Sequence, residues 1–216
     1  EMQAIADIAI EHDLWVLSDE AYFEMRYSGT STSIASLPGM AERTVILYTF
    51  SKKFAMTGWR LGCAVAPVPV AEMIAKLNTN DESCTTHFVQ AAGVEAIAHP
   101  EGAAPMLAEL QRRRDAAVDG LAAIDGITCA TPDATFYLFP NVTAVMSRMG
   151  FAAVGDFATA ALQNTGVSFC TRQHFGRPQA DETEQYIRLA YSGISVDDIA
   201  EGLDRLAAWT TTGGAA

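Results

Sequence analysis

Short apolar runs alternate with helical patterns in the first half of the chain. Residues 2–12 place Ile5, Ile8 and Ala9 at helical spacing, which predicts an amphipathic helix. Three largely apolar runs follow, at residues 14–17, 44–50 and 61–66. Apolar runs of this length between helical segments are typical of strands in a mainly parallel sheet that is covered on both faces. The first half therefore predicts an α/β domain.

Further helical patterns follow two prolines, at residues 70–78, 84–98 and 101–123. The middle segment is small or apolar on nearly all sides, so we expect it to be buried. The third segment contains three consecutive arginines, residues 112–114, followed by Asp115. Such a basic run is typical of a solvated helix face that pairs with nearby acids.

The pattern changes at about residue 125. Short predicted strands at 127–130, 136–140, 166–169 and 186–191 alternate with predicted helices near 151–164 and 195–209. We expect the tail from Thr210 to fray. The chain therefore divides, in prediction, into part of a large domain (1–100), a long connecting helix (101–124) and a small α+β domain (125–216).

Composition narrows the possible partners. The sequence carries 14 basic and 26 acidic residues, a net charge of −12, which disfavours nucleic acid and anionic membranes. The histidines are too scattered to predict a metal site, and the longest apolar stretch is interrupted by prolines and a glutamate. The cysteines are scattered without a CxxC pair, which favours buried free thiols and a cytoplasmic location. They are Cys63, Cys84, Cys129 and Cys170.

The most specific chemical pattern directly follows the second apolar run. The segment TFSKKFAMTGWRLG, residues 49–62, combines three hydroxyls, two of them just before the first lysine, with two lysines and an arginine. A lysine amine that is partly desolvated and near other positive charge can act as nucleophile and base. Hydroxyls and a guanidinium can hold a phosphate. Together they indicate a site for a phosphorylated cofactor that forms a Schiff base.

This segment resembles the cofactor-lysine motif of the class I/II aminotransferases, which are fold-type-I enzymes that use pyridoxal 5'-phosphate (PLP). The resemblance implies that Lys52 is the Schiff-base lysine and that Thr49, Ser51 and Arg60 hold the PLP phosphate. Thr49 stands where serine is common in the family. Lys53 stands where many relatives carry a small polar residue, so the motif leaves open which lysine is used.

A second motif, SDEAY at residues 18–22, follows the first apolar run. Taken alone, an aspartate here caps a turn. Beside Lys52 the motif is similar to the family's Asp-Glu-x-Tyr sequence, which implies that Asp19 pairs with the protonated pyridine nitrogen and that Tyr22 hydrogen-bonds the phenolic oxygen. A carboxylate at that nitrogen keeps the ring an electron sink. We expect Glu20 to be structural.

A third motif, YIRLAYS at residues 186–192, places Arg188 inside an apolar strand, where its charge needs a partner. The resemblance implies that Arg188 binds the substrate α-carboxylate, and a structural salt bridge is the alternative. Ala134-Thr135 replaces the Gly-Ala pair that usually precedes the family's aromatic strand. Arg172 and His174 are either specificity residues for an acidic side chain or surface loop.

The resemblance covers nearly the whole chain but implies only the C-terminal part of the family fold: an incomplete large domain with a small C-terminal domain. In relatives, the segment that precedes the matched part carries further motifs that contact the cofactor. None of these motifs occurs in this sequence. We therefore expect an N-terminally truncated chain that is inactive alone and whose uncovered apolar faces favour self-association.

The implied activity is transfer of an amino group between an α-amino acid, aspartate as the first choice, and a 2-oxo acid, in a homodimer. One alternative is another fold-type-I PLP enzyme, such as a C–S lyase or an ACC-synthase-like enzyme. A second is a non-catalytic domain that binds PLP or an amino acid as a regulatory signal. A third is an inert fragment that only associates.

Overall fold

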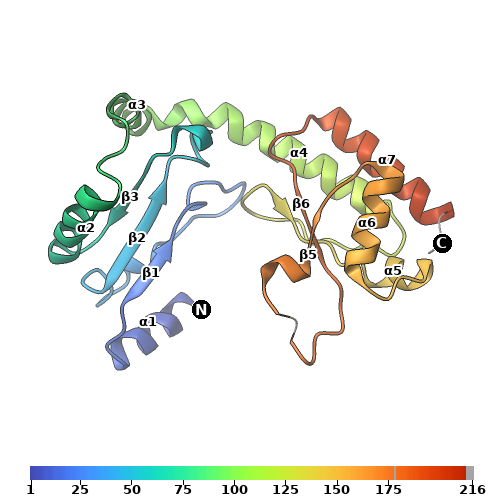
Figure 1. The fold of residues 1–216 in the computed structure, drawn as a ribbon, viewed down its shortest axis with the longest axis horizontal. Helices are drawn as coiled ribbons and strands as arrows, with labels where there is room; N and C mark the ends of the chain where they lie inside the picture. Colours follow the sequence, from blue (N-terminus) through green and yellow to red (C-terminus); the bar gives the residue numbers. More distant parts are fainter. Residues whose placement is uncertain (178, 213–216) are drawn as a thin grey trace. The chain divides into compact units, whose positions relative to one another are not determined.

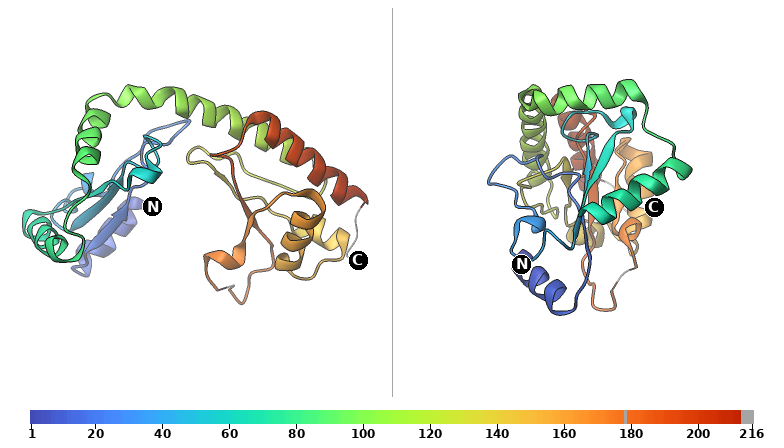
Figure 2. Two further views of the ribbon diagram at one scale, coloured as in Figure 1. Left: turned by 45° about the horizontal axis from the view of Figure 1, so that its top comes forward. Right: turned by 90° about the vertical axis from the view of Figure 1, so that its left-hand side faces the viewer.

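The structure, a computed structural model, describes residues 1–177 and 179–212. Contacts within the chain separate two compact units, Glu1–Leu107 and Ala108–Ala216 (Figures 1 and 2). The division falls inside the long helix α4 (Ala104–Ala122).

Unit 1 is built on a three-stranded sheet of order β1-β2-β3 (Figure 1). The strands are β1 (Val16–Asp19), β2 (Thr44–Thr49) and β3 (Gly62–Val65), which confirms the three predicted strands. β1 and β2 are parallel, whereas β2 and β3 are antiparallel. The sheet is therefore mixed, and the expectation of a mainly parallel sheet holds for one of its two pairings. The β2–β3 connection contains only the short 3-10 turn η2 (Thr57–Trp59), and without a crossover helix the chain doubles back.

The first helix, α1 (Met2–Glu11), forms where predicted but buries a different face. Ala6 and Ala9 pack with Ile34 and Met40 in a small core, with Ile34 contributed by the 3-10 turn η1 (Ile34–Ser36). Two residues of the predicted apolar face, Ile5 and Ile8, are instead 52% and 53% exposed. Alanines allow the closer approach to the loop that follows β1, so the smaller side chains take the interior position.

The second and third helices, α2 (Val68–Asp81) and α3 (His87–Ala98), also form where predicted. The expectation that the segment 84–98 is buried is wrong for this chain, because Phe88, Val94 and Ile97 are each more than 60% exposed. A helix that is apolar on nearly all sides needs neighbours on more than one side. Here only Val89 and Gly93 are buried.

Gly93 shows how closely α3 approaches its one covered side. A Cβ atom at this position would lie 2.5 Å from Leu61 Cδ2 and 3.5 Å from Phe50 Cε1. The sheet itself is open as well, since Leu17 of β1 and Val65 of β3 are 67% and 57% exposed. The expectation of a sheet covered on both faces is therefore wrong within the described residues.

Unit 2 contains a second sheet of order β4-β6-β5, in which both pairings are antiparallel. Its strands are β4 (Tyr137–Leu138), β5 (Cys170–Thr171) and the central β6 (Ile187–Ala190). The predicted strand at 127–130 is reduced to a bridge between Thr128 and Asn141, and the one predicted at 166–169 starts later, at Cys170. The edge strands are too short to give a clear alternating pattern in the sequence.

Helices cover this sheet: the second half of α4, α5 (Thr143–Met149), α6 (Val154–Thr165) and α7 (Val196–Thr212) (Figure 1). Its core includes the fully buried Leu121, Phe157 and Leu206. A Cβ atom at Gly120 would lie 2.5 Å from Leu203 Cδ1, so the glycine allows α4 and α7 to pack closely. α7 extends to Thr212 with Thr210 buried, so the expected fraying is wrong there, and residues 213–216 lie outside the described residues.

The arginine run of α4 and the two remaining 3-10 turns complete the description. The arginine run pairs locally as predicted, Arg112 and Arg113 with Glu109, and Arg114 with Asp115. The remaining 3-10 turns are η3 (Pro100–Ala103) in unit 1 and η4 (Arg172–Phe175) in unit 2.

The cysteines are free as expected, but the expectation that they are buried is wrong: Cys63 and Cys84 are exposed, and Cys129 and Cys170 are only partly buried. These two lie in unit 1, on the open sheet and in the loop before α3, where little covers them. Across residues 1–177 and 179–212, no helix has both the length and the apolar character needed to cross a membrane.

Candidate active site

The first site motif lies at the carboxyl end of β1. Asp19 is the last residue of that strand and is exposed, and one of its oxygens, Oδ1, accepts a hydrogen bond from the backbone N–H of Ala21 at 3.2 Å. Glu20 Oε1 accepts hydrogen bonds from the hydroxyls of Ser18 and Ser33, which ties the turn to η1. Glu20 therefore has the structural role expected of it, and Asp19 caps its turn with one oxygen.

Lys52 and Tyr22 come together from separate segments. The Lys52 Nζ atom lies 5.7 Å from the centroid of the Tyr22 ring, within the range of a cation–π interaction. Both side chains are partly buried. Tyr22 follows β1 and Lys52 follows β2, and these two strands are parallel neighbours. The contact thus forms at the carboxyl edge of the sheet, where ligand sites form in open α/β sheets.

Thr49 and Ser51 form a pair of hydroxyls directly before Lys52. Their Oγ atoms are 2.9 Å apart, and the backbone N–H of Ser51 donates to Thr49 Oγ1 at 3.1 Å. Ser51 is buried, and Thr49 is partly buried at the end of β2. The turn after β2 therefore presents two neighbouring hydroxyls beside the lysine.

Arg60 stands apart from that pair. It adopts the left-handed conformation with φ 55° and its Nη1 donates to the carbonyl of Thr57 at 3.0 Å. Its exposed side chain lines an open cavity of about 610 Å³, together with Trp59, Thr85 and Phe88 among others. Within the described residues, no hydrogen bond joins Arg60 to Thr49 or Ser51.

The adjacent lysine, Lys53, has different partners. Its Nζ forms an ion pair with Glu24 Oε1, and Tyr48 Oη donates to Glu24 Oε2 at 2.7 Å. Burial alone would raise the pKa of Glu24, but the hydrogen bonds from Lys53 and Tyr48 lower that pKa overall. Burial, and then the Glu24 carboxylate, raise the pKa of Tyr48. Sequence reasoning missed Glu24 and Tyr48, because no motif connects residues so far apart along the chain.

In unit 2, Arg188 lies on the central strand β6 close to two aromatic rings. Its guanidinium carbon is 4.5 Å from the ring centroid of Tyr137 and 4.5 Å from that of Phe175. Its Nη2 lies 3.8 Å from the sulfur of Cys170, the residue opposite it on β5. Among the residues that the structure describes, no carboxylate pairs with Arg188, so the alternative of a structural salt bridge gains no support.

The loop after β5 uses its polar residues locally. Arg172 forms an ion pair with Glu182 at 2.9 Å and donates to the carbonyls of Gly176 and Arg177. The Nδ1 atom of His174 lies 3.0 Å from the Thr171 hydroxyl. These contacts favour the interpretation of Arg172 and His174 as part of the loop rather than as specificity residues.

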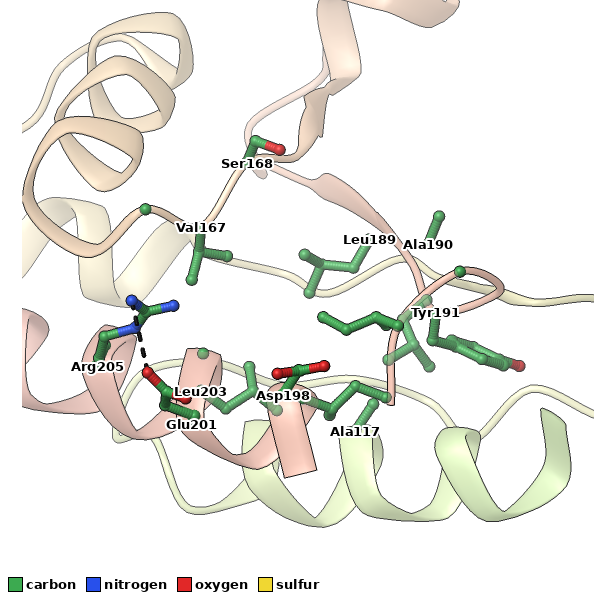
Figure 3. Close-up of a pocket in the computed structure, with 16 residues that line it drawn as sticks. Ala117, Val167, Ser168, Leu189, Ala190, Tyr191, Asp198, Glu201, Leu203 and Arg205 are labelled. Carbon is green, nitrogen blue, oxygen red and sulfur yellow. Dashed lines mark ion pairs between the residues drawn. The ribbon is translucent and has the colours of Figure 1, made fainter. Parts of the chain in front are cut away.

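Unit 2 also contains a cavity of about 400 Å³ between α4, β6 and α7 (Figure 3). Figure 3 shows Asp198, Glu201 and Arg205 of α7 on the side opposite Val167 and Leu189, with Arg205 and Glu201 paired at 3.8 Å. None of the site residues predicted from the sequence lines this cavity.

Comparison with known proteins is consistent with this geometry. An aspartate aminotransferase of Musicola paradisiaca is 34% identical over 96% of this chain and 50% of its own length. The aromatic-amino-acid aminotransferase 2 of Thermococcus litoralis is 34% identical over 95% of this chain and 51% of its own length. The chain thus spans about half the length of the curated relatives it matches.

Solved structures show the same fold. An aromatic aminotransferase from Pyrococcus horikoshii superimposes with a TM-score of 0.86 at 32% identity, over 97% of this chain and 54% of that one. An aspartate aminotransferase from Rhizobium meliloti gives a TM-score of 0.84 at 28% identity, over 97% of this chain and 53% of that one. The model of the family "Aminotransferase class I and II" matches residues 1–206. With the lysine motif, both units and nearly the full length matched, the chain belongs to the class I and II aminotransferases.

Proposed function

We propose that Lys52 is the residue that binds PLP covalently in an aminotransferase. The observation that carries this proposal is the contact between the Lys52 amine and the Tyr22 ring at the carboxyl edge of β1 and β2. The family motif names these two residues independently, and the fold brings them together. A lysine beside an aromatic hydroxyl and a hydroxyl pair is a donor set that fits an aldehyde with a phosphate.

The surrounding residues have distinct proposed roles. Asp19, exposed at the end of β1 with one oxygen free of the turn, would pair with the pyridine nitrogen. The Tyr22 hydroxyl would donate to the phenolic oxygen. Thr49 and Ser51, with hydroxyls 2.9 Å apart, would hold the phosphate, and Arg60 would supply the positive charge. PLP, when bound, supplies an electron sink for the charge that develops at the substrate Cα.

In addition to binding the cofactor, Lys52 would transfer protons during the reaction. With PLP and substrate bound, the Lys52 amine would accept the proton from the substrate Cα as a general base and return a proton as a general acid.

Arg188 is proposed to bind the α-carboxylate of the substrate. Its guanidinium carbon lies 4.5 Å from the ring centroids of both Tyr137 and Phe175, so two aromatic rings help to position the group. Arginine binds carboxylates in a planar, bidentate manner, so a guanidinium positioned by two rings is suited to this contact. Every α-amino acid and 2-oxo acid carries the group that this edge would bind.

The wider setting is also a proposal. Relatives act by name on aspartate, aromatic amino acids and asparagine, and we propose aspartate with a 2-oxo acid as the first pair to test. We propose a cytoplasmic homodimer, which fits the four free cysteines. The two units support the proposal that residues 1–100 belong to a large cofactor domain and residues 125–216 to a small one.

A PLP titration followed by absorbance tests the cofactor proposal on this chain. The wild type and Lys53→Ala should give the spectral change of a lysine-bound pyridoxal, and Lys52→Ala should not. An equal change in Lys52→Ala and wild type would contradict the proposal. Transamination is proposed for a protein of the relatives' full length that contains this chain. Formation of glutamate from aspartate and 2-oxoglutarate would separate it from an elimination reaction.

A further inference from the structure

Lys53 is an unusual neighbour for a cofactor lysine, because a second amine one residue away can compete for the same aldehyde. We propose that Glu24 and Tyr48 form a positioning pair that keeps Lys53 from reacting with carbonyl groups, so that Lys53 does not compete with Lys52 for the cofactor aldehyde. The consequence for PLP rests on the function proposed above. The low reactivity of Lys53 toward aldehydes does not rest on that function, and it can be measured with any small aldehyde.

The chemistry explains why pairing matters. An amine reacts with an aldehyde only through its unprotonated lone pair, which forms the N–C bond while the carbonyl oxygen leaves as water. An ammonium that is held by a carboxylate must first leave that partner and lose a proton. An ion pair therefore slows the reaction of the lysine that carries it, and has no such effect on a neighbour outside the pair.

The contacts of Lys53 fit this role. Its Nζ is paired with Glu24 Oε1 and lies 5.0 Å from the centroid of the Phe54 ring. Its side chain is only 18% exposed. Tyr48 Oη donates to the second oxygen of Glu24 at 2.7 Å, so both carboxylate oxygens are engaged. The hydrogen bond from Tyr48 thus helps to hold the Glu24 carboxylate in the position where it pairs with Lys53.

The surroundings strengthen the pair. Glu24 and Lys53 border a small cavity of about 180 Å³ whose other walls include Met25, Pro100 and Leu107. Apolar walls lower the local dielectric, which makes opposite charges attract more strongly than in open water. The raised pKa of Tyr48 keeps its phenol protonated and donating across the neutral range. The lowered pKa of Glu24 keeps its carboxylate charged over the same range.

The chain allows a sharp test because it has only three lysines: Lys52, Lys53 and Lys76. Lys76 lies exposed on α2 and serves as the internal reference. Limited methylation with formaldehyde and cyanoborohydride, in which the hydride completes the new N–C bond, would be followed by fragmentation mass spectrometry to assign each methyl group. The measured quantity is the labelling of Lys53 relative to Lys76 in the full chain.

In the wild type, Lys53 should be labelled more slowly than Lys76. Glu24→Gln should raise the Lys53 to Lys76 ratio about fivefold, the effect of losing one partly buried ion pair. Tyr48→Phe keeps the ion pair but frees one carboxylate oxygen, so its increase should be smaller. Glu201→Gln, the same substitution in unit 2 where Glu201 pairs with Arg205, is the matched control and should leave the ratio unchanged.

Two results would overturn the inference: a wild-type Lys53 as reactive as Lys76, or no rise in Glu24→Gln beyond that of Glu201→Gln. A second arm replaces formaldehyde with PLP and borohydride, and here label should shift in part from Lys52 to Lys53 in Glu24→Gln. If the formaldehyde arm shows protection while PLP labels no lysine selectively, the pairing role stands and the proposed cofactor site on this chain fails.

Discussion

The Arg188 guanidinium carbon lies 4.5 Å from the centroid of the Tyr137 ring, and the centroid of the Phe175 ring is at the same distance. The pairing of β4 with β6 brings Tyr137 near this arginine, since Tyr137 is opposite Ala190, two residues beyond Arg188. Within residues 1–177 and 179–212, this arginine in an apolar strand thus meets aromatic rings and forms no ion pair with a carboxylate.

Arg188→Lys should weaken substrate binding while leaving the fold intact. Lysine keeps the charge but loses the planar, bidentate contact with a carboxylate. In a full-length protein containing this chain, we expect KM for the amino acid to rise about tenfold or more. Steady-state kinetics with aspartate would measure it. An unchanged KM would remove Arg188 from the proposed site.

The aromatic clamp, defined as Tyr137 and Phe175, should tune that binding. Tyr137→Leu removes one cation–π contact, and we expect KM to rise about two- to fivefold. Phe151→Leu is the matched control, because Phe151 is another aromatic of unit 2 that packs on Phe157 and Trp209. Equal effects of the two substitutions would show that the rings contribute general packing and do not position the guanidinium.

Thr135 carries measurable backbone strain. It has φ 68°, a left-handed conformation that costs a β-branched residue about 1–2 kcal/mol. Its hydroxyl accepts a hydrogen bond from the backbone N–H of Tyr137 at 3.3 Å. Thr135→Asn, which tolerates this conformation and keeps an acceptor, should stabilise the chain by about 1 kcal/mol. Thr135→Val keeps the strain, loses the acceptor and should destabilise it. Urea denaturation of both variants tests the order.

The Glu24–Lys53 pair should contribute stability that depends on pH. Because the pKa of Glu24 is lower in the folded chain than its ordinary value of 4.5, the contribution is present above that value and is lost as pH falls through the folded pKa. Glu24→Gln should therefore lower the urea midpoint at neutral pH, and the difference from wild type should vanish in acid. A difference that persists at low pH would assign the effect to packing.

The exposed apolar side chains of α3 should promote self-association of this chain. Phe88 and Ile97 are 67% and 62% exposed on the same short helix. Exposed apolar patches of this kind drive association in water. Sedimentation should show a lower average mass for the double variant Phe88→Glu, Ile97→Glu than for wild type. A change of the same size in Phe139→Glu of unit 2 would point to added charge alone as the cause.

Local patterns predicted much of the structure. The strands β1, β2, β3 and β6, and most of the longer helices, follow from apolar runs and helical spacing. The helix α5 was not predicted, since seven residues are too few to show a period. It begins after Asn141, whose side chain accepts the backbone N–H of Thr143, and it ends at Gly150 in the left-handed conformation.

The remaining features depend on contacts between segments that are far apart in the sequence. Whether α3 is buried depends on what lies around it, which spacing alone does not reveal. The motif at residues 49–62 identified two lysines, but their difference in environment comes from Glu24 and Tyr22, on a separate segment of the chain. The alternative of a salt bridge at Arg188 was reasonable from the sequence, because the approach of Tyr137 and Phe175 is a property of the folded sheet.

Reductive trapping of PLP would identify the lysine that holds the cofactor, which we propose is Lys52. The chain would be incubated with PLP, reduced with borohydride and digested, and the modified residue identified by mass spectrometry. We expect a single pyridoxyl group on Lys52, with Lys53 and Lys76 essentially unlabelled. Label on Lys53, or label spread equally over all three lysines, would contradict it.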